Sequence, residues 1–413
     1  MINKKKKVLI SGFNARPLSK SLYNSNYEVY AVDFFGDSDL FPYIKDALII
    51  TKELKTNFQK LKFIYSNVLT DLTLQMIEKY PYLDYLIIAS GLDDNIIGRE
   101  KIFKKIKKLN HPIRYLGNNI NQIIKARDIL SINLILEQMG YKVPKTLTFN
   151  CDLIDNNLIN YPIILKKKQS SGGLNIFKIN SKAHLLSIVK NNEEFDENSE
   201  NWLFQEYIDG IDVSCTTISN EVDAKIISIN EQLIGKEFLN APSEFIYCGN
   251  IVPADLNFSL QNKISEISLK LVKHLNLIGI NGFDFVLKNG CPYLMEINPR
   301  IPGSINAAEV ALKRNLIDEH INCCLNPDKE IIISNLDINT NFVSKFIYFA
   351  PKLISYHKIE KLKQIINVED IPAPGRDIQP FEPLCSILYK ADNYSKAYKG
   401  ALSIVESIEL LIK

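Results

Sequence analysis

The sequence predicts a protein of mixed class, part α/β and part α+β, with more than one domain. Short apolar strands alternate with helices over residues 1–115, which is typical of a doubly wound parallel sheet. Two strand-like runs flank a hairpin turn within residues 279–304, which indicates antiparallel structure later in the chain. A chain of 413 residues with 46% hydrophobic residues can bury several cores, and this length suggests two to four domains.

The composition argues against several classes of partner. The net charge is +2, so no broad surface for nucleic acid is expected. The 7 cysteines are scattered without a CxxC pattern, which favours reduced thiols and a cytoplasmic location. Lys4–Lys7 precede only the short apolar stretch Val8–Ile10, which is too short for a signal peptide or a membrane span. We therefore expect no membrane contact.

Residues 1–115 are expected to form strands over 8–11, 28–32, 46–50 and 85–89, with helices over 17–23 and 71–80. Ligands of such sheets bind beyond the carboxyl ends of the strands. The candidates that follow these strand ends are Asn14, Arg16, Asp33, Gly91, Asp93 and Asp94. Among them we predict that Arg16 and Asp93 bind substrate; a role in a turn or cap is the alternative for each. Residues 12–17 lack the GxGxxG pattern, so a dinucleotide is not expected.

A helix is predicted over 127–139, ended by Gly140, and a strand over 161–166 ends at Lys166. A flexible loop with Gly172 and Gly173 follows. Glycine lets backbone N–H groups approach phosphate oxygens, and the ammonium group of Lys166 can neutralise their charge. The order of a Walker loop is missing, and a surface hairpin is the alternative interpretation.

The next strand is expected over 202–208. It carries the polar pair Gln205 and Glu206 near its end, and Ile208 is its last residue. The extended connection after this pair can present backbone N–H and C=O groups to the edge of an adenine ring. Asp212, four residues beyond Ile208, can reach ribose hydroxyls. Each of these features alone is weak evidence for a nucleotide site. Their order along the chain strengthens this interpretation.

The hairpin of residues 283–297 carries the most specific chemistry. Glu296 and Asn298 share one face of a strand, and the turn at 288–290 can bring Asp284 opposite them. These three oxygen donors suit Mg²⁺, with Mn²⁺ as a substitute. Arg300 lies just beyond, where its planar group can meet a carboxylate or phosphate. The alternative is an ordinary hairpin with acids on its solvent face.

Taken together, these residues resemble the ATP-grasp superfamily, of the carboxylate–amine ligase type, over roughly residues 115–330. The resemblance implies that ATP lies between two lobes and that magnesium bridges its phosphates. It further implies that Lys166 contacts the phosphates, that the Gly172–Gly173 loop covers them, and that Asp212 holds the ribose. It also implies that adenine is held by Gln205, Glu206 and Ile208. The metal ions are implied to bind to Asp284, Glu296 and Asn298.

The flanking segments extend this resemblance. Residues 1–115 are similar to the Rossmann-like domain that precedes ATP-grasp domains. Residues 331–413, with short strands and a final helix from about Tyr394 to Ile412, resemble a small β-rich C-terminal domain that closes on the cleft. We therefore expect domains at 1–115, 116–330 and 331–413.

The chain departs from the family pattern at three positions. Asp128-Ile129 stands where Asp-Lys is common, and Lys125 or Arg127 are the candidates to replace the missing lysine. Asp212 replaces the commoner Glu, which is one carbon longer. Gln205 stands where Glu is common, so the adenine contact loses a charge.

The expected reaction is the ATP-dependent joining of a carboxylate to an amine through an acyl phosphate, with release of ADP and phosphate. Lys166 and Arg300 are the predicted catalytic residues, since both can neutralise the transferred phosphoryl group. The expected partners are a small carboxylate and a small amine, such as an amino acid or a cofactor precursor; assembly as a homodimer stays open. One alternative is a carboxylase of this superfamily that uses bicarbonate. The other is a non-catalytic ATP-binding regulatory protein, which Ile129 favours and the intact metal hairpin opposes.

Overall fold

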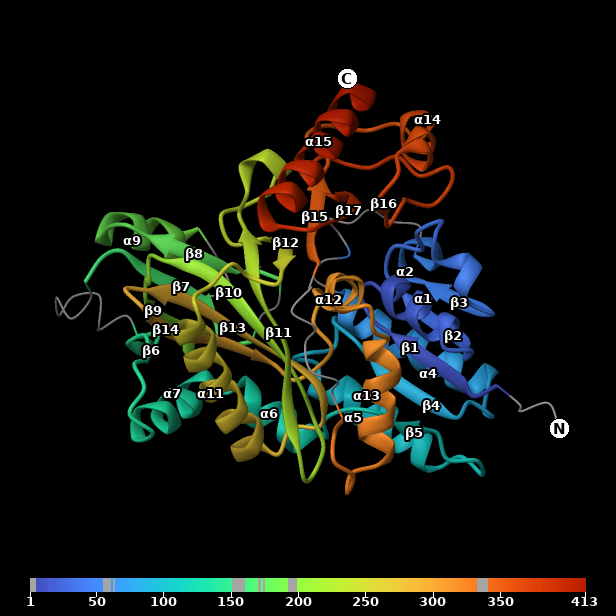
Figure 1. The fold of residues 1–413 in the computed structure, drawn as a ribbon, viewed down its shortest axis with the longest axis horizontal. Helices are drawn as coiled ribbons and strands as arrows, with labels where there is room; N and C mark the ends of the chain where they lie inside the picture. Colours follow the sequence, from blue (N-terminus) through green and yellow to red (C-terminus); the bar gives the residue numbers. More distant parts are fainter. Residues whose placement is uncertain are drawn as a thin grey trace.

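A computed structural model arranges the chain in three sheets (Figure 1). The structure describes residues 5–54, 61, 64–150, 160–169, 172–173, 175–191, 199–332 and 341–413. Within these residues, one sheet has 5 parallel strands, one has 4 antiparallel strands and one has 8 antiparallel strands. The predicted combination of a parallel sheet with antiparallel structure is confirmed.

The N-terminal sheet has the strand order β3-β2-β1-β4-β5, all parallel. Val8 and Ile10 of β1 pack on the side of α1, whereas Leu9 packs with α4 and α5 on the other face. This alternation follows from the two-residue period of a strand and explains the continuous apolar run at the start of the chain. The elements are β1 (Lys7–Ser11), α1 (Arg16–Asn24), β2 (Glu28–Asp33), β3 (Asp46–Ile49), α2 (Ile50–Glu53), α4 (Tyr65–Lys79), β4 (Tyr85–Ile88), α5 (Ile96–Lys107) and β5 (Arg114–Tyr115).

Two sequence predictions in this part of the chain need correction. The helix expected over 71–80 is α4, which begins at Tyr65. The single helix expected over 127–139 is two helices, α6 (Ile120–Arg127) and α7 (Ile129–Gln138). Asp128 separates them, because its side chain accepts a hydrogen bond from the backbone N–H of Ser131 at 3.3 Å and caps the second helix.

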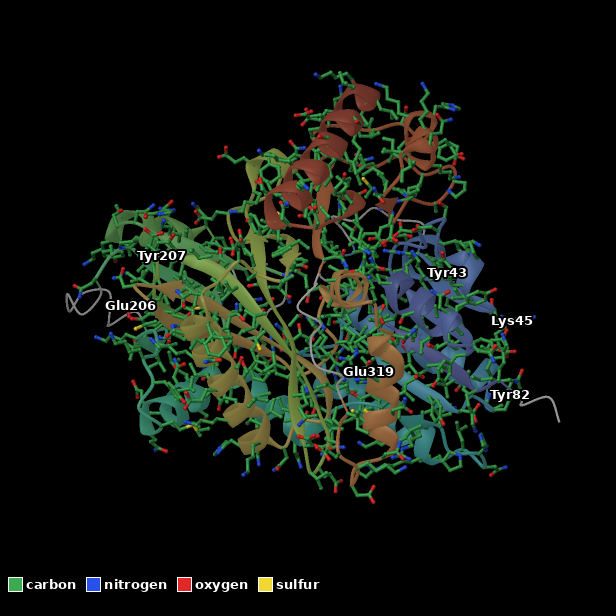
Figure 2. The ribbon with its side chains drawn as sticks, in the orientation of Figure 1. Tyr43, Lys45, Tyr82, Glu206, Tyr207 and Glu319 are labelled. Atoms are coloured by element: carbon green, nitrogen blue, oxygen red, sulfur yellow. The ribbon has the colours of Figure 1, made fainter. Side chains whose placement is uncertain are left out.

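The four-stranded sheet has the order β6-β9-β7-β8, with Trp202 fully buried beneath it. Figure 2 shows Glu206 and Tyr207 in this lobe, on the opposite side of the molecule from Tyr43 and Tyr82, which lie in connections of the N-terminal region. The elements are β6 (Thr146–Thr148), β7 (Ile163–Lys167), β8 (Ile176–Ile179), α9 (Lys182–Lys190) and β9 (Trp202–Glu206).

The eight-stranded sheet has the order β14-β13-β10-β11-β12-β15-β17-β16. The β13–β14 hairpin turns through Asn289 (φ 52°) and Gly290 (φ 72°), as the sequence predicts for residues 288–290. One face of the hairpin packs in a common core with α11. The elements are β10 (Ile211–Ser219), β11 (Ala224–Ile234), β12 (Tyr247–Val252), α11 (Phe258–Leu275), β13 (Gly279–Lys288), β14 (Cys291–Asn298), α12 (Ile305–Leu312) and α13 (Leu316–Leu325).

The last part of the chain continues the same sheet. β15 pairs with β12 and with β17, and the final helix packs on both of these C-terminal strands. The sheet therefore runs across the boundary expected near residue 331, and the division into three domains stays a prediction. The elements are β15 (Phe342–Phe349), α14 (Tyr356–Ile359), β16 (Val368–Glu369), β17 (Pro383–Ala391) and α15 (Tyr394–Ile412). None of the helices in the described ranges combines the length and apolarity needed to cross a membrane.

Candidate active site

A cavity of about 700 Å³ lies where the three sheets meet. Its lining comes from the four-stranded sheet, from the eight-stranded sheet and from loops at the carboxyl ends of β1, β2 and β4. The cavity gathers all of the predicted nucleotide and metal residues and the predicted catalytic residues. These are Lys166, Gly172, Gly173, Gln205, Glu206, Ile208, Asp212, Asp284, Glu296, Asn298 and Arg300.

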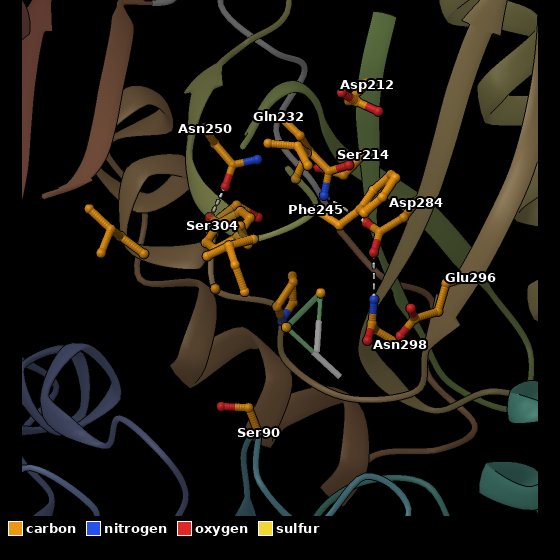
Figure 3. A pocket seen from close by; sticks show the side chains of 18 of the residues that line it. Ser90, Asp212, Ser214, Gln232, Phe245, Asn250, Asp284, Glu296, Asn298 and Ser304 are labelled. Atoms are coloured by element: carbon orange, nitrogen blue, oxygen red, sulfur yellow. Dashed lines mark hydrogen bonds between the residues drawn. The ribbon is translucent and has the colours of Figure 1, made fainter. Parts of the chain in front are cut away.

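The hairpin brings its oxygen donors together as the sequence predicts. Asp284 pairs directly with Glu296 across the two strands, and Asn298 lies opposite Gly282. Asn298 Nδ2 donates to Asp284 Oδ2 at 2.8 Å, and Gln232 Nε2 donates to Asp284 Oδ1 at 3.0 Å (Figure 3). Burial and the adjacent Glu296 raise the pKa of Asp284 to about 7. Two carboxyl groups this close favour a cation between them, so the donor set fits Mg²⁺.

Gln232 could not be assigned from the sequence. It lies in β11, and only the pairing of β10 with both β11 and β13 places it beside Asp284. A glutamine in a strand has no distinguishing spacing, so no motif search would select it.

Arg127, at the end of α6, is the second residue whose contacts only the structure shows. Its Nε and Nη2 donate to both carboxylate oxygens of Asp94, at 2.9 and 3.0 Å, and its Nη1 forms an ion pair with Glu296. Burial disfavours the charged guanidinium, but Glu296 and Asp94 raise the pKa of Arg127 above its ordinary value. The sequence offered Arg127 only as one of two replacements for the missing lysine. Of the two, it is the one that contacts a predicted metal ligand.

Lys166 is the fourth residue of β7 and lines the cavity together with residues of the hairpin. Its Nζ donates to the backbone oxygen of Met295 at 3.5 Å. Burial lowers the pKa of Lys166 to about 8, although Glu296 opposes this shift. Within the described part of the chain, Lys166 has no carboxylate partner at hydrogen-bond distance, and a lysine of this kind on the wall of a cavity is suited to a polyanionic ligand.

Gly173 lies against the connection between β11 and β12. Its φ is +82°, and a Cβ atom at this position would lie 1.9 Å from the backbone oxygen of Phe245. Only glycine fits this contact. Gly172 has φ +69° and open space around its Cα, so its backbone stays accessible from the cavity.

The predicted adenine residues lie at one end of the cavity. The Gln205 side chain is buried and donates to Thr146 Oγ1 at 3.0 Å, so it is held within its own sheet. The backbone N–H of Glu206 donates to the backbone oxygen of Lys145 at 2.8 Å. Ile208 is buried on the cavity wall. Burial raises the pKa of Asp212 to about 6, and Lys236 opposes this shift.

Asp93 does not line the cavity; it is buried behind Arg300 and forms an ion pair with Arg300 Nε. Burial opposes ionisation of Asp93, but Arg300, Arg127 and Arg99 lower the pKa of Asp93 below its ordinary value. Arg300 Nη2 also donates to Asn298 Oδ1 at 3.3 Å. Asp93 therefore orients Arg300, and the hypothesis that it contacts substrate directly has no support in this geometry.

Arg16 is also absent from the cavity wall. Its side chain is buried and reaches Asp370 Oδ1 at 2.7 Å and Glu369 Oε2 at 2.9 Å. These ion pairs join α1 to the last residue of β16 and to the residue that follows it. The geometry gives Arg16 a structural role between the N-terminal sheet and the end of the chain, and offers no support for substrate binding.

The comparison with protein families gives a match at the same region. Residues 126–304 match the family model of the ATP-grasp domain. These residues belong to the ATP-grasp family. The matched range begins one residue before Arg127 and ends at Ser304, so it includes every predicted nucleotide and metal residue.

Similar proteins and structures agree with this assignment. The chain is 26% identical to an uncharacterized protein of Methanocaldococcus jannaschii, with 93% of this chain and 88% of the relative aligned. It is 27% identical to the coenzyme gamma-F420-2:alpha-L-glutamate ligase of Methanococcus maripaludis, covering 63% of this chain and 83% of that protein. An L-amino acid ligase of Bacillus licheniformis has the same fold, with a TM-score of 0.69 at 17% identity, over 99% of this chain and 98% of that chain.

Proposed function

We propose that this ATP-grasp protein is a ligase that joins a small carboxylate to an amine, with an acyl phosphate as the intermediate. The observation that carries the proposal is the arrangement of Asp284, Glu296 and Asn298 on one cavity wall, with Lys166 and Gly173 also facing the cavity. Cation ligands and phosphate-binding groups are thereby gathered around one space. Its volume of about 700 Å³ is that of a small-molecule site.

In this proposal the adenine of ATP lies at Gln205, Glu206 and Ile208, and the ribose lies at Asp212. Lys166 and the backbone of Gly172 and Gly173 bind the phosphates. The positive φ and open surroundings of Gly172 support this role, as does the lowered pKa of Lys166. A polyphosphate would restore the charged form of that lysine, because an adjacent negative charge favours the ammonium ion.

The reaction has two steps. A carboxylate oxygen attacks the γ-phosphorus of ATP and ADP leaves; the amine nitrogen then attacks the acyl carbon, phosphate leaves and the nitrogen loses a proton. Asp284, Glu296 and Asn298 would hold Mg²⁺, which neutralises charge on the phosphates. Arg300, fixed by Asp93, lies where its guanidinium can stabilise the transferred phosphoryl group. No nucleophile from the protein is required.

The relatives support carbon–nitrogen bond formation. The Methanococcus maripaludis protein is named as a glutamate ligase, and its match spans 83% of its own length. The Bacillus licheniformis structure is named as an L-amino acid ligase; at 17% identity that likeness supports the fold alone. We therefore place amino acids first among the substrates to be tested.

The test is an ADP-release screen of the purified full-length chain with Mg·ATP. Each carboxylate, with amino acids first, is paired with each amine and with buffer alone, and bicarbonate without amine forms a separate arm. The proposal expects ADP release that needs both an acid and an amine, with an equimolar amide product by mass spectrometry. ADP release with bicarbonate alone would instead identify a carboxylase. Binding of Mg·ATP without ADP release from any pair would favour the regulatory protein.

A further inference from the structure

The end of the cavity beside the N-terminal sheet contains a carboxyl group that the reaction above does not use. Asp37, in the loop after β2, lines the cavity with 6% of its surface exposed. Asn14 and Asp370 line the same end of the cavity. Among the described residues, neither a hydrogen bond nor an ion pair is formed by the Asp37 side chain, and Arg16 acts on it only through its charge.

The neighbouring acids differ from Asp37 because each of them has partners. Asp33 accepts hydrogen bonds from the backbone N–H groups of Ala15, Phe35 and Gly36, at 2.6–2.8 Å. Asp39 accepts from the backbone N–H groups of residues 370 and 371, both at 3.0 Å. The fold itself therefore supplies hydrogen-bond partners for the carboxyl groups of Asp33 and Asp39.

Asp370 is likewise held in place. Its Oδ1 accepts from Arg16 Nε at 2.7 Å and from Asn14 Nδ2 at 3.1 Å. The nearby Lys345 does not neutralise an acid directly, because its Nζ donates to Gly303 O at 2.7 Å and to Asn306 Oδ1 at 3.0 Å. Asp37 is thus the acid of this group that stays unpaired in the described part of the chain.

An unpaired buried carboxylate is costly, and burial is the main reason why the pKa of Asp37 lies well above its ordinary value; Asp370, Asp33 and Asp39 add to the shift. A bound cation would reverse this penalty. A metal ion is a poor candidate here, since the neighbouring acids Asp33, Asp39 and Asp370 already accept hydrogen bonds from backbone N–H groups or from Arg16.

Aromatic side chains surround the same end of the cavity. Phe13, Phe35 and Tyr65 line it, with ring centroids 5.0 Å apart for Phe13 and Phe35 and 5.4 Å apart for Phe13 and Tyr65. From the C-terminal segment, Phe349 and Phe381 line the cavity as well. A carboxyl group bordered by rings is suited to an organic cation, whose hydrocarbon part contacts the rings and whose ammonium group meets the acid.

We propose that Asp37 binds an ammonium group of the substrate that does not take part in the reaction. This inference rests on the proposed ligase function and narrows its substrate class to molecules with a second, charged amine. A diamine and a diamino acid such as L-lysine both carry such a group. The proposal assigns Asp37 to a nitrogen that stays protonated throughout the reaction, whereas the attacking nitrogen must lose its proton to have a free electron pair.

The test is calorimetric titration of the full-length chain, loaded with Mg²⁺ and a non-hydrolysable ATP analogue, with 1,4-diaminobutane and with L-lysine. The matched compounds 1-aminobutane and 6-hydroxy-L-norleucine lack the second ammonium group. We expect the parent protein to bind 1,4-diaminobutane or L-lysine at least about tenfold more tightly than the matched compound. This difference is in line with the loss of one charged hydrogen bond. Asp37→Asn, which keeps the shape and removes the charge, should abolish this preference.

Asp71→Asn is the control, because Asp71 is an exposed acid on α4, away from the cavity lining. If Asp37→Asn does not fold by thermal melt, Asp37→Glu replaces it and should keep the charge preference. The inference is overturned if the parent binds none of the probes, shows no preference for the second ammonium, or keeps that preference in Asp37→Asn. The ligase function fails on a different result, the absence of ADP release that needs both an acid and an amine, so the two can be told apart.

Discussion

Arg127 forms an ion pair with Glu296, a residue of the β13–β14 hairpin and a proposed metal ligand, while its other two nitrogens bind Asp94. The side chain of Arg127 is 6% exposed, so the pairing takes place in a largely dry environment. Arg127→Met should therefore lower the free energy of unfolding by about 3 kcal/mol, because it leaves the buried Asp94 without its partner. Urea unfolding monitored by circular dichroism measures this loss. The double variant Arg127→Met/Asp94→Asn should recover most of it, and equal stability of parent and single variant would refute the effect.

The same double variant tests whether Arg127 replaces the lysine that is missing at Ile129. With its stability restored, it should still bind Mg·ATP about tenfold more weakly than the parent, since one cationic contact to phosphate is lost. Calorimetric titration with a non-hydrolysable analogue gives the dissociation constant. Affinity equal to that of the parent would leave Arg127 with a structural role only.

Lys166 should make nucleotide binding depend on pH. Burial lowers the pKa of Lys166 to about 8 in the ligand-free protein. Phosphate binding needs the ammonium form, so affinity for Mg·ATP should fall as the pH rises from about 8 towards the ordinary lysine value near 10.4. Lys166→Met should bind at least about tenfold more weakly at pH 7 and lose most of this dependence. Lys390→Met is the control, since Lys390 is an exposed lysine of β17, and its pH profile should follow the parent.

The buried His320 should make the free energy of unfolding smaller in mild acid. Its Nδ1 accepts from the backbone N–H of Ile280 at 2.9 Å, and burial lowers the pKa of His320 to about 4. Below the ordinary value near 6.5 the unfolded chain binds a proton that the folded chain does not, so stability falls as the pH falls from about 6.5 through about 4. The full contribution is about 3 kcal/mol.

The His320 effect is measured by urea unfolding at pH 7 and pH 4.5. His320→Gln removes the titrating group and should lose less stability over this interval than the parent does. His111→Gln, at an exposed position, should follow the parent. A parent and a His320→Gln variant with parallel losses would show that His320 is not the responsible group.

The sequence was most informative where side-chain period and turn chemistry act locally. The alternation from Phe283 to Leu287 and the turn at residues 289–290 predicted the hairpin, and the observed pairing of Asp284 with Glu296 follows from both. The structure also gives a physical reason for the glycine at position 173, which has a backbone requirement that no other residue meets; the phosphate-binding role of Lys166 and of this loop stays a prediction.

The partners of the predicted residues could not be derived in this way. Asp93 and Arg16 both follow strand ends, where ligands usually bind, yet each forms ion pairs with residues far away in the chain. Separations of 207 and 354 residues leave no periodic signal in the sequence. For the same reason the unpaired state of Asp37 became visible only when the contacts of Asp33, Asp39 and Asp370 were known.

The measurement that tests the central claim most directly is Mg²⁺-dependent ADP formation by Glu296→Gln, with the acid–amine pair found in the screen. The substitution keeps the size of the side chain and removes the charge that the metal and Arg127 require. We expect activity to fall at least about a hundredfold, in the range seen when one electrostatic contact to a transition state is lost. Glu406→Gln, at an exposed position on α15, should retain parent activity. A folded Glu296→Gln protein, shown by an unchanged thermal melt, that forms ADP at the parent rate would contradict the metal hairpin and the ligase mechanism built on it.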